Sequence, residues 1–291
     1  MRAGAGRGSH SWGGVKGWML GVAGAVAVTT AANAVVVEGL NIILPPPAGG
    51  WVGGWNGSSG VPVSQYWVLT ARHVGGSAGQ HFVMRGQWYL AAEIRQHPTL
   101  DLQLIRVTTP MPAWHAIAPQ QFAGTAVYLG GCGHTTQSPL PNNQGWDWGG
   151  ERFEAWGRNR IETAGSMLRI RFDAPGANAE PQEGAFALND SGAGLFVMGP
   201  NGQLQLAGTA VTVSGGGAST YGSSCYCVAL HTAQPWISSN IGGQVDPPFN
   251  CNMFDFLSRW FARDMSADFD GNSVIDVADI FSYLGAWFET C

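Results

Sequence analysis

Three short segments of the chain carry, in this order, a histidine, an aspartate and a serine. His73 follows an apolar run, Asp101 directly precedes another, and Ser191 lies in a turn rich in glycine and alanine. A serine hydroxyl is a weak nucleophile, but a neutral imidazole within hydrogen-bond reach can take its proton during attack on a carbonyl carbon. A carboxylate beside the imidazole fixes its tautomer and stabilises the imidazolium that forms. Together the three side chains predict a Ser-His-Asp catalytic site for acyl transfer.

The turn around Ser191 also offers backbone donors for the oxyanion that develops during such a reaction. Each preorganised donor is worth roughly 3 kcal/mol. Because the neighbouring residues are small, we expect the N–H groups of Asn189 and Ser191 to converge and form an oxyanion hole. Taken singly, residues such as His73 and Asp101 are more often structural, so the prediction depends on the three segments occurring together and in order.

The elements that must position these residues are short. Apolar runs separated by Gly, Pro, Asn and Ser recur across residues 35–243, and four of them are residues 66–70, 102–107, 126–129 and 204–213. Their length and spacing indicate strands of a barrel or sandwich. Residues 232–241 indicate a closing helix. With 43 glycines in 291 residues, the composition favours a turn-rich β protein over a helical bundle.

The motifs resemble those of the chymotrypsin-like (trypsin-type) serine proteases. The family's Thr-Ala-Ala-His-Cys is matched by residues 70–74, its Asp-Ile-Ala-Leu-Leu by residues 101–105, and its Gly-Asp-Ser-Gly-Gly by residues 189–193. The resemblance spans about residues 50–241. It implies a mainly β fold of two six-stranded antiparallel β-barrels with the active site in the cleft between them.

The chain departs from the family pattern at two functional positions. Val74 replaces the cysteine that follows the histidine, so the disulfide made there is absent. Asn189 replaces the oxyanion-hole glycine, and asparagine adopts glycine-like backbone angles less readily. No member of the triad is lost.

The resemblance also implies a primary substrate pocket. Its base would be Ala185, six residues before the nucleophile, and its wall would include Val211 and Val213. No acid lies at the base, which argues against a preference for Arg or Lys. We expect cleavage after small or medium apolar residues. The activation route stays open, because the amino group that pairs with Asp190 in animal relatives could come from Val35 after leader removal or from cleavage at an internal Arg.

The N-terminal segment, residues 1–34, has the pattern of a secretory signal peptide. Three cations without an acid precede an apolar run over residues 18–28, and a small-x-small sequence ends at Ala34. The run is too short to span the ~30 Å hydrocarbon core of a membrane. We therefore expect cleavage after Ala34 and a secreted or cell-surface protein without a transmembrane segment.

Charge and cysteine content narrow the function classes further. The only lysine is Lys16, which excludes a basic nucleic-acid-binding surface. Export permits disulfides, but the five cysteines are odd in number, so at least one is free or pairs between chains. Residues 225–227 (Cys-Tyr-Cys) have no second pair at metal-ligand spacing, so a zinc site is not expected. Cys251 and Cys291 bracket the C-terminal segment and are the best candidates for a bridge.

The last residues differ in composition from the rest. A linker at residues 244–249 leads into residues 250–291, where oxygen-bearing groups follow the spacing of a calcium loop. Ca²⁺ takes 6–8 oxygen ligands, and this spacing wraps them around one centre. A solvated acidic turn is the alternative. The expected ligands of one Ca²⁺ ion are Asp268, Asp270, Asn272, the Val274 carbonyl, Asp276 and Asp279.

A repeat surrounds this loop. Phe254, Leu257, Trp260 and Phe261 recur 27 positions later as Phe281, Leu284, Trp287 and Phe288. The spacing places each set on one helical face and predicts two helices packed against each other. The segment resembles dockerin modules and related EF-hand-type bacterial modules. It carries one calcium loop where dockerins carry two, and the resemblance implies a cohesin-like or cell-surface docking partner.

The sequence thus predicts a secreted serine endopeptidase, with no cofactor for catalysis, that is tethered by a calcium-binding C-terminal module. The alternative is a catalytically inactive protease-like protein used for adhesion or binding. A further alternative makes the tail a stabilising appendage only.

Overall fold

The computed structural model describes Met1 and residues 35–39, 47, 49–149, 152, 154–199, 202–214, 216–242, 253–263, 267, 269 and 274–290. The predicted leader beyond Met1 and the predicted linker lie outside this set. None of the described helices is both long and apolar enough to cross a membrane.

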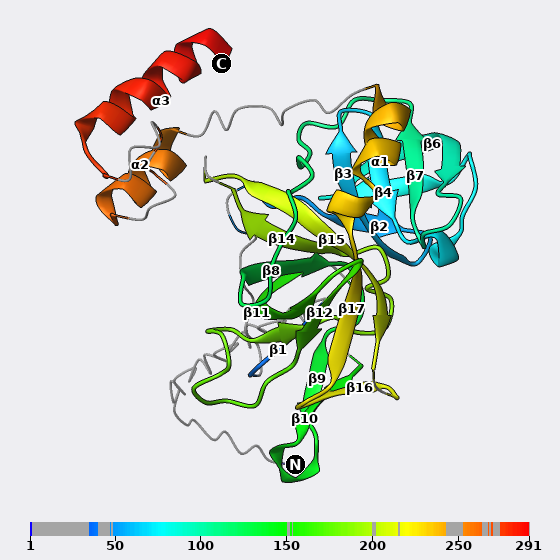
Figure 1. Cartoon of the computed structure of the whole chain (residues 1–291). Coiled ribbons are helices and arrows are strands. Elements are labelled where there is room, and N and C mark those ends of the chain that lie inside the picture. Colours follow the sequence, from blue (N-terminus) through cyan, green and yellow to red (C-terminus); the bar gives the residue numbers. More distant parts are fainter. Residues whose placement is uncertain are drawn as a thin grey trace. The chain divides into compact units, whose positions relative to one another are not determined.

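The first half of the described chain forms a closed six-stranded barrel (Figure 1). All of its pairings are antiparallel. Around the barrel the strands follow the order β2-β3-β4-β7-β6-β5. They are β2 (Gly53–Trp55), β3 (Ser58–Ser64), β4 (Trp67–Thr70), β5 (His81–Met84), β6 (Gln87–Gln96) and β7 (Gln103–Val107).

The second half forms another closed six-stranded antiparallel barrel, in the order β11-β12-β17-β15-β14-β8. Its strands are β8 (Ala126–Gly131), β11 (Ala155–Ala164), β12 (Met167–Arg171), β14 (Gly194–Met198), β15 (Leu204–Val213) and β17 (Ser224–Ala229). The two barrels confirm the predicted mainly β, trypsin-like fold class.

Shorter strands extend the second barrel. One pair joins β1 (Val36–Val37) to β13 (Gly184–Ala185). A three-stranded sheet has the order β16-β10-β9. Its members are β9 (Thr136–Pro139), β10 (Gly145–Trp148) and β16 (Ala218–Thr220).

Helices are few in the described barrel region. The predicted closing helix is present as the 3-10 turn η3 (Leu230–Thr232) followed by α1 (Gln234–Ile241). Ile237 of α1 is fully buried, as its place in the apolar pattern predicts. The other 3-10 turns are η1 (Arg72–Val74) and η2 (Pro141–Asn143).

An apolar cluster joins the two barrels. It combines Leu69 and Leu104 of the first barrel with Trp156 and Phe196 of the second, and with Ile237 of α1. All five side chains are nearly or fully inaccessible to solvent. Burial of this area stabilises the placement of one barrel on the other, and this placement sets the position of the site described below.

The C-terminal helices are α2 (Met253–Phe261) and α3 (Val277–Thr290). They pack through Phe256 and Tyr283, whose rings stack with centroids 4.1 Å apart. The predicted inward face is partly wrong, because Phe254 and Phe281 are 83% and 69% exposed. The apolar face of α2 is wide, and the stripe that is buried lies toward one side of it and shares Leu257 and Trp260 with the predicted set. This stripe consists of Met253, Phe256, Leu257 and Trp260.

Candidate active site

The three predicted catalytic side chains lie at the ends of three elements. His73 is in η1, which follows β4 after one residue, Ala71, whose backbone is still extended. Asp101 lies just before β7, and Ser191 lies in the turn that leads into β14. Two of the residues therefore belong to the first barrel, and Ser191 belongs to the second.

The structure brings these side chains into one hydrogen-bonded row. The Nδ1 atom of His73 is 2.6 Å from Oδ2 of Asp101, and its Nε2 atom is 2.7 Å from Oγ of Ser191. The other carboxylate oxygen of Asp101 accepts the backbone N–H of His73 at 2.9 Å. Asp101 thus holds both the ring and the backbone of His73. With the Nδ1 proton donated to the carboxylate, Nε2 is the acceptor for the Ser191 hydroxyl.

The row is open to solvent on one side. The His73 and Asp101 side chains are 46% and 33% exposed, and Ser191 is half-buried. A substrate carbonyl can therefore reach Ser191 without a large rearrangement.

The turn before β14 has the backbone shape that the sequence made uncertain. Asn189 lies at φ 69°, in the left-handed region that favours glycine. Two hydrogen bonds close the turn, from Asp190 N to Ala187 O and from Ala193 N to Asp190 O. Within the described residues the N–H groups of Asn189 and Ser191 donate to no acceptor, so both are available to an external oxygen.

A buried carboxylate supports this turn from behind. Asp190 is 1% exposed and accepts the backbone N–H groups of Gly133 and Ala187, each at 2.9 Å. Burial raises the pKa of Asp190 to about 7, while the two amide hydrogen bonds and the charge of Arg152 act in the opposite direction. A Cβ on Gly133 would lie 2.6 Å from the Asp190 carboxylate, which explains the need for glycine there.

Sequence reasoning missed two residues that connect the barrels at this point. The N–H of Ser59 donates to the carbonyl of Ser191 at 3.0 Å, and the hydroxyl of Thr70 donates to the carbonyl of Ser59 at 2.6 Å. Both side chains are fully buried. The available signal was that Ser59 and Thr70 are polar residues within apolar strands. Their spacing in the sequence does not indicate which residue they bond to.

The predicted pocket residues lie on two strands that do not pair with each other, β13 of the short β1–β13 pair and β15 of the second barrel. Ala185 is buried in β13, and Val211 and Val213 are partly buried in β15. Val213 pairs with Cys225 of β17. The paired strand β1 consists of Val36 and Val37, so it places no charged side chain opposite Ala185.

The residues just after the predicted leader form that covering strand. Val35, Val36 and Val37 are at most 2% exposed, and Val36 pairs with Ala185. The predicted pocket base is thus paired with the start of the predicted mature chain. The sequence left the placement of this segment open.

Only part of the predicted calcium loop is described. Asp268, Asp270 and Asn272 lie outside the described residues, whereas Val274, Asp276 and Asp279 lie within them. Asp279 is fully buried, and its carboxylate accepts the N–H groups of Phe269 at 2.7 Å and Asp276 at 2.9 Å. The described residues contain no cluster of three or more His, Cys, Asp or Glu side chains that could hold a metal.

The described cysteines, Cys132, Cys225 and Cys227, are all free thiols. Burial raises the pKa of each, that of Cys225 to about 12, so these thiols are neutral and unreactive near pH 7. The expected partners Cys251 and Cys291 lie outside the described residues, and their bridge stays a prediction.

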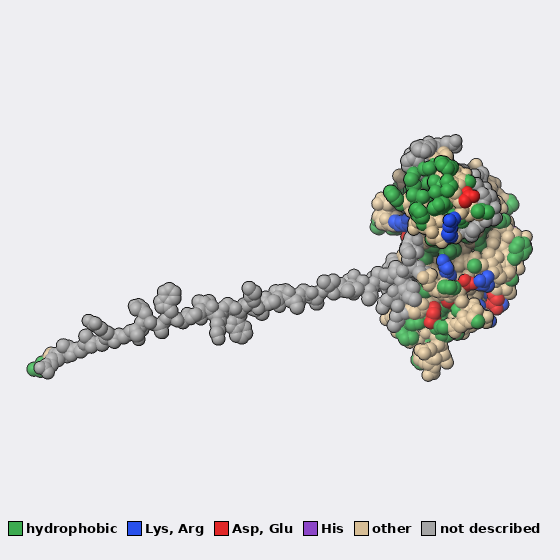
Figure 2. Space-filling model, turned by 90° about the vertical axis from the view of Figure 1, so that its left-hand side faces the viewer, with side chains coloured by type: hydrophobic (Ala, Val, Ile, Leu, Met, Phe, Trp, Pro, Cys, Tyr) green, Lys and Arg blue, Asp and Glu red, His purple; other side chains and the backbone are tan. Residues whose placement is uncertain are grey.

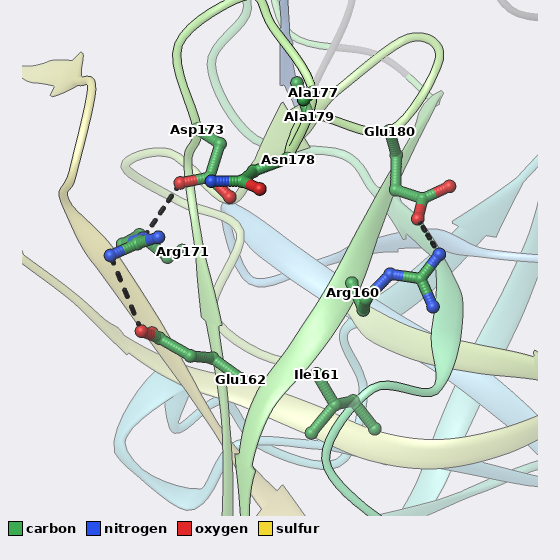
Figure 3. A pocket seen from close by; sticks show the side chains of 9 residues that line it. All are labelled: Arg160, Ile161, Glu162, Arg171, Asp173, Ala177, Asn178, Ala179 and Glu180. Carbon is green, nitrogen blue, oxygen red and sulfur yellow. Dashed lines mark hydrogen bonds and ion pairs between the residues drawn. The ribbon is translucent and has the colours of Figure 1, made fainter.

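A polar cavity of about 290 Å³ lies on the second barrel beside the loop that follows β12 (Figure 3). Its charged side chains are paired with one another. Arg160 contacts Glu180, and Arg171 contacts both Asp173 and Glu162. None of the triad residues lines this cavity.

Comparisons with known proteins add little to this geometry. No family model matches the chain, and no curated protein matches it. Among solved structures, the chain is similar to neuropsin, a serine protease expressed in the limbic system of mouse brain. The identity is 17% and the TM-score 0.48, over 68% of this chain and 97% of that chain. The fold class rests on the two closed barrels of the chain itself.

Proposed function

We propose that this chain is a serine endopeptidase that hydrolyses peptide bonds through an acyl-enzyme. The observation that carries the proposal is the continuous row from Asp101 through His73 to Ser191, with contacts of 2.6 and 2.7 Å. These lengths lie within the range required between a nucleophile, its base and the group that orients the base.

In the proposed first step, the Oγ atom of Ser191 bonds to the carbonyl carbon of the scissile peptide while its proton passes to Nε2 of His73. Collapse of the tetrahedral intermediate breaks the C–N bond, and the same proton passes from Nε2 to the leaving amine. A water molecule then attacks the ester, with His73 again as base, and releases the acid and the free serine. Asp101 keeps its negative charge throughout and stabilises the imidazolium.

The proposed oxyanion hole consists of the N–H groups of Asn189 and Ser191. The left-handed backbone at Asn189 and the unused N–H groups support this role. Since the donors belong to a turn supported by the buried Asp190, they need no reorganisation when charge develops on the carbonyl oxygen.

We propose cleavage after small or medium apolar residues. The pocket base would be Ala185 and the wall would include Val211 and Val213. An uncharged base gives no partner to an Arg or Lys side chain, and a branched valine at the wall narrows the entrance.

The proposed location is extracellular or at the cell surface. Support comes from the leader pattern of residues 1–34 and from the buried strand at Val36, which begins directly after the expected cleavage point. Export would also place the protein among peptide substrates outside the cell.

The proposed C-terminal module binds one Ca²⁺ ion in the loop between α2 and α3. The donor set fits this ion, because every expected ligand offers oxygen. The buried Asp279 carboxylate also lies against the N–H of Phe269, so the end of the loop folds back to its start. Asp268, Asp270, Asn272, Val274, Asp276 and Asp279 would hold the ion, which would brace the two helices and take no part in peptide hydrolysis.

We further propose that this module docks to a partner, either cohesin-like or on the cell surface. Figure 2 shows apolar side chains gathered on one face of the molecule. In α2, Phe254 and Phe261 are 83% and 73% exposed, and Phe281 of α3 is 69% exposed. Exposed aromatic side chains at this density are typical of interaction surfaces.

The experiment that tests the proposed activity is labelling of the purified mature protein with a fluorophosphonate. Wild type should be modified at Ser191, and His73→Ala should not, since no base would then activate the hydroxyl. A peptide-library digest of the same preparation reports specificity. If Ser191 is not labelled and no peptide is cleaved, the inactive adhesion protein is the correct alternative.

A further inference from the structure

A second cavity, of about 490 Å³, is lined by residues of both barrels. Its volume is within the range of ligand sites in proteins. The first barrel contributes Gly57 and Ser58 at the start of β3, and the second contributes Cys132. Charged side chains lie around it, namely Arg85, Arg152 and Glu154.

This cavity lies next to the candidate active site. Gly57 follows Asn56, whose Nδ2 donates to the carbonyl of Val74, the neighbour of His73, at 2.7 Å. Ser58 precedes Ser59, whose N–H donates to the carbonyl of Ser191 at 3.0 Å. The cavity wall is therefore tied to the segments of both the base and the nucleophile.

The cavity also lies on a defined side of the nucleophile. The carbonyl of Ser191 bonds to Ser59, while the N–H of Gly192, in the same peptide unit, donates to the carbonyl of Ala210 at 2.8 Å. The C=O and N–H of a trans peptide point in opposite directions. Hence β15, with the predicted pocket wall, is on one side of Ser191, and the cavity is on the other.

The charges of the cavity do not cancel. The Arg85 guanidinium lies 3.8 Å from the Trp51 ring centroid, donates to the carbonyl of Gly50 at 2.6 Å and contacts Glu154 at 3.4 Å. Arg85 is thereby held in place and paired. Arg152 donates to the carbonyl of Gly57 and has no carboxylate partner among the residues that the structure describes.

The other polar wall residues, Ser58 and Cys132, do not offset this charge. Burial raises the pKa of the Cys132 thiol, which stays neutral. Among the described residues that line the cavity, two guanidinium groups and one carboxylate leave a net positive charge.

We propose that this cavity receives an acidic side chain from the part of the substrate that follows the scissile bond, and that Arg152 selects it. The inference rests on the proposed peptidase function. If the acyl half of the peptide occupies the pocket at Ala185, Val211 and Val213, the leaving half must continue past Ser191 to the opposite side. There a Glu or Asp carboxylate meets a guanidinium, which can donate two hydrogen bonds to it.

The test uses internally quenched peptides with a small apolar residue before the scissile bond. In one series the first residue after that bond is Glu, Gln or Lys. In the other series the second residue after the bond is varied in the same way. For wild type we expect, in at least one series, a kcat/KM for Glu about tenfold above that for Gln, the change that one charge-assisted hydrogen bond supports. Lys should be the poorest of the three.

Variants assign the effect to Arg152. R152Q should bring the Glu:Gln ratio close to one, and R152E should reverse the preference in favour of Lys. The control R106Q removes an exposed arginine from β7 and should keep the tenfold ratio. Because each ratio compares two substrates on one preparation, a lower fraction of folded protein does not alter it.

The outcomes separate this inference from the proposed function. Cleavage of all peptides with Glu:Gln ratios near one in both series would overturn the acidic preference and leave the peptidase intact. A tenfold ratio that persists in R152Q would overturn the role of Arg152. Failure of every peptide, together with an unlabelled Ser191, would overturn the proposed peptidase itself.

Discussion

Thr70 and Gly192 lie in contact across the two barrels. A Cβ on Gly192 would come within 2.1 Å of Oγ1 of Thr70 and within 2.2 Å of the Ser59 carbonyl oxygen. Thr70 ends the strand that leads to His73, and Gly192 follows Ser191 directly. The distance between the base and the nucleophile therefore depends on the absence of a side chain at Gly192.

Gly192→Ala should lower kcat/KM by about 100-fold or more, because the new methyl group must displace either Thr70 or the nucleophile turn, and errors of about 1 Å cost about that much. The matched control is Gly222→Ala. Gly222 has a similar φ, 88° against 85°, but nothing lies within 4 Å of its Cβ position. The Gly222→Ala variant should lose about 1 kcal/mol of stability from backbone strain and keep the kcat/KM of wild type. Equal losses of activity in the two variants would contradict this account.

His115 should make stability depend on pH. Burial lowers its pKa to about 4, its Nδ1 is 3.0 Å from the Leu204 carbonyl, and its Nε2 accepts the Trp51 N–H at 3.1 Å. The unfolded chain binds the proton near pH 6.5, so the unfolded state gains protons first as the pH falls. The contribution of His115 is thus complete above pH 6.5 and is lost as the pH falls towards 4.

Chemical unfolding at pH 7.5 and pH 5.0 measures this effect. The free energy of unfolding should fall between pH 7.5 and pH 5.0, and this fall should be about 2 kcal/mol larger in wild type than in His115→Gln. The comparison between the two proteins removes the contributions of the other titrating groups, including Asp190. Identical pH profiles would show that His115 is not neutral in the native state or not buried.

The β1 strand should contribute measurably to stability. Val36→Ala removes two methyl groups from a fully buried side chain opposite Ala185, and we expect a loss of about 2 kcal/mol. Val277→Ala makes the same change at a side chain that is 54% exposed. Its free energy of unfolding should lie within about 0.5 kcal/mol of the wild-type value. Urea denaturation compares them. A small effect at Val36 would mean that the strand is dispensable to the second barrel.

Calcium binding can be followed through Trp260. Its Nε1–H donates to the carbonyl of Asp276 at 2.7 Å, so the indole lies beside the predicted loop and should sensitise the luminescence of bound Tb³⁺. Ca²⁺ should displace the terbium. Asp279→Asn removes one charged ligand and should lower the affinity for both Tb³⁺ and Ca²⁺ by about tenfold or more.

Asp147→Asn, in β10 of the barrel region, is the control for that titration and should match wild type. Chelation of Ca²⁺ should lower the helix signal without changing the rate of peptide hydrolysis. Unchanged terbium binding in Asp279→Asn would argue for the solvated acidic turn.

The sequence was informative where signals are local. The run that precedes His73 and the run that follows Asp101 have the length and composition of strands, and both form strands of the first barrel. Strand 204–213 has the predicted bounds. The contact between Ser59 and Ser191 was not predictable, because it joins residues 132 positions apart through backbone atoms that carry no residue-type signal.

The C-terminal helices show another limit of sequence reasoning. The repeat of Phe254 at Phe281 correctly indicated two helices but not which face they bury. The apolar face of α2 is wider than the stripe that it buries, so stripes of the same helical spacing overlap on it, and only the partner decides among them. Phe256 is buried because the Tyr283 ring stacks on it.

The cluster of Leu69, Leu104, Trp156, Phe196 and Ile237 attaches one barrel to the other mainly by apolar contact. Such contact has no preferred direction, so the register of His73 against Ser191 depends on the few directional contacts across the junction, such as the hydrogen bond from the Ser59 N–H to the Ser191 carbonyl. Transfer of a proton between His73 and Ser191 requires that register. On warming, the molecule should consequently pass through an intact but silent form, and loss of turnover will precede loss of structure.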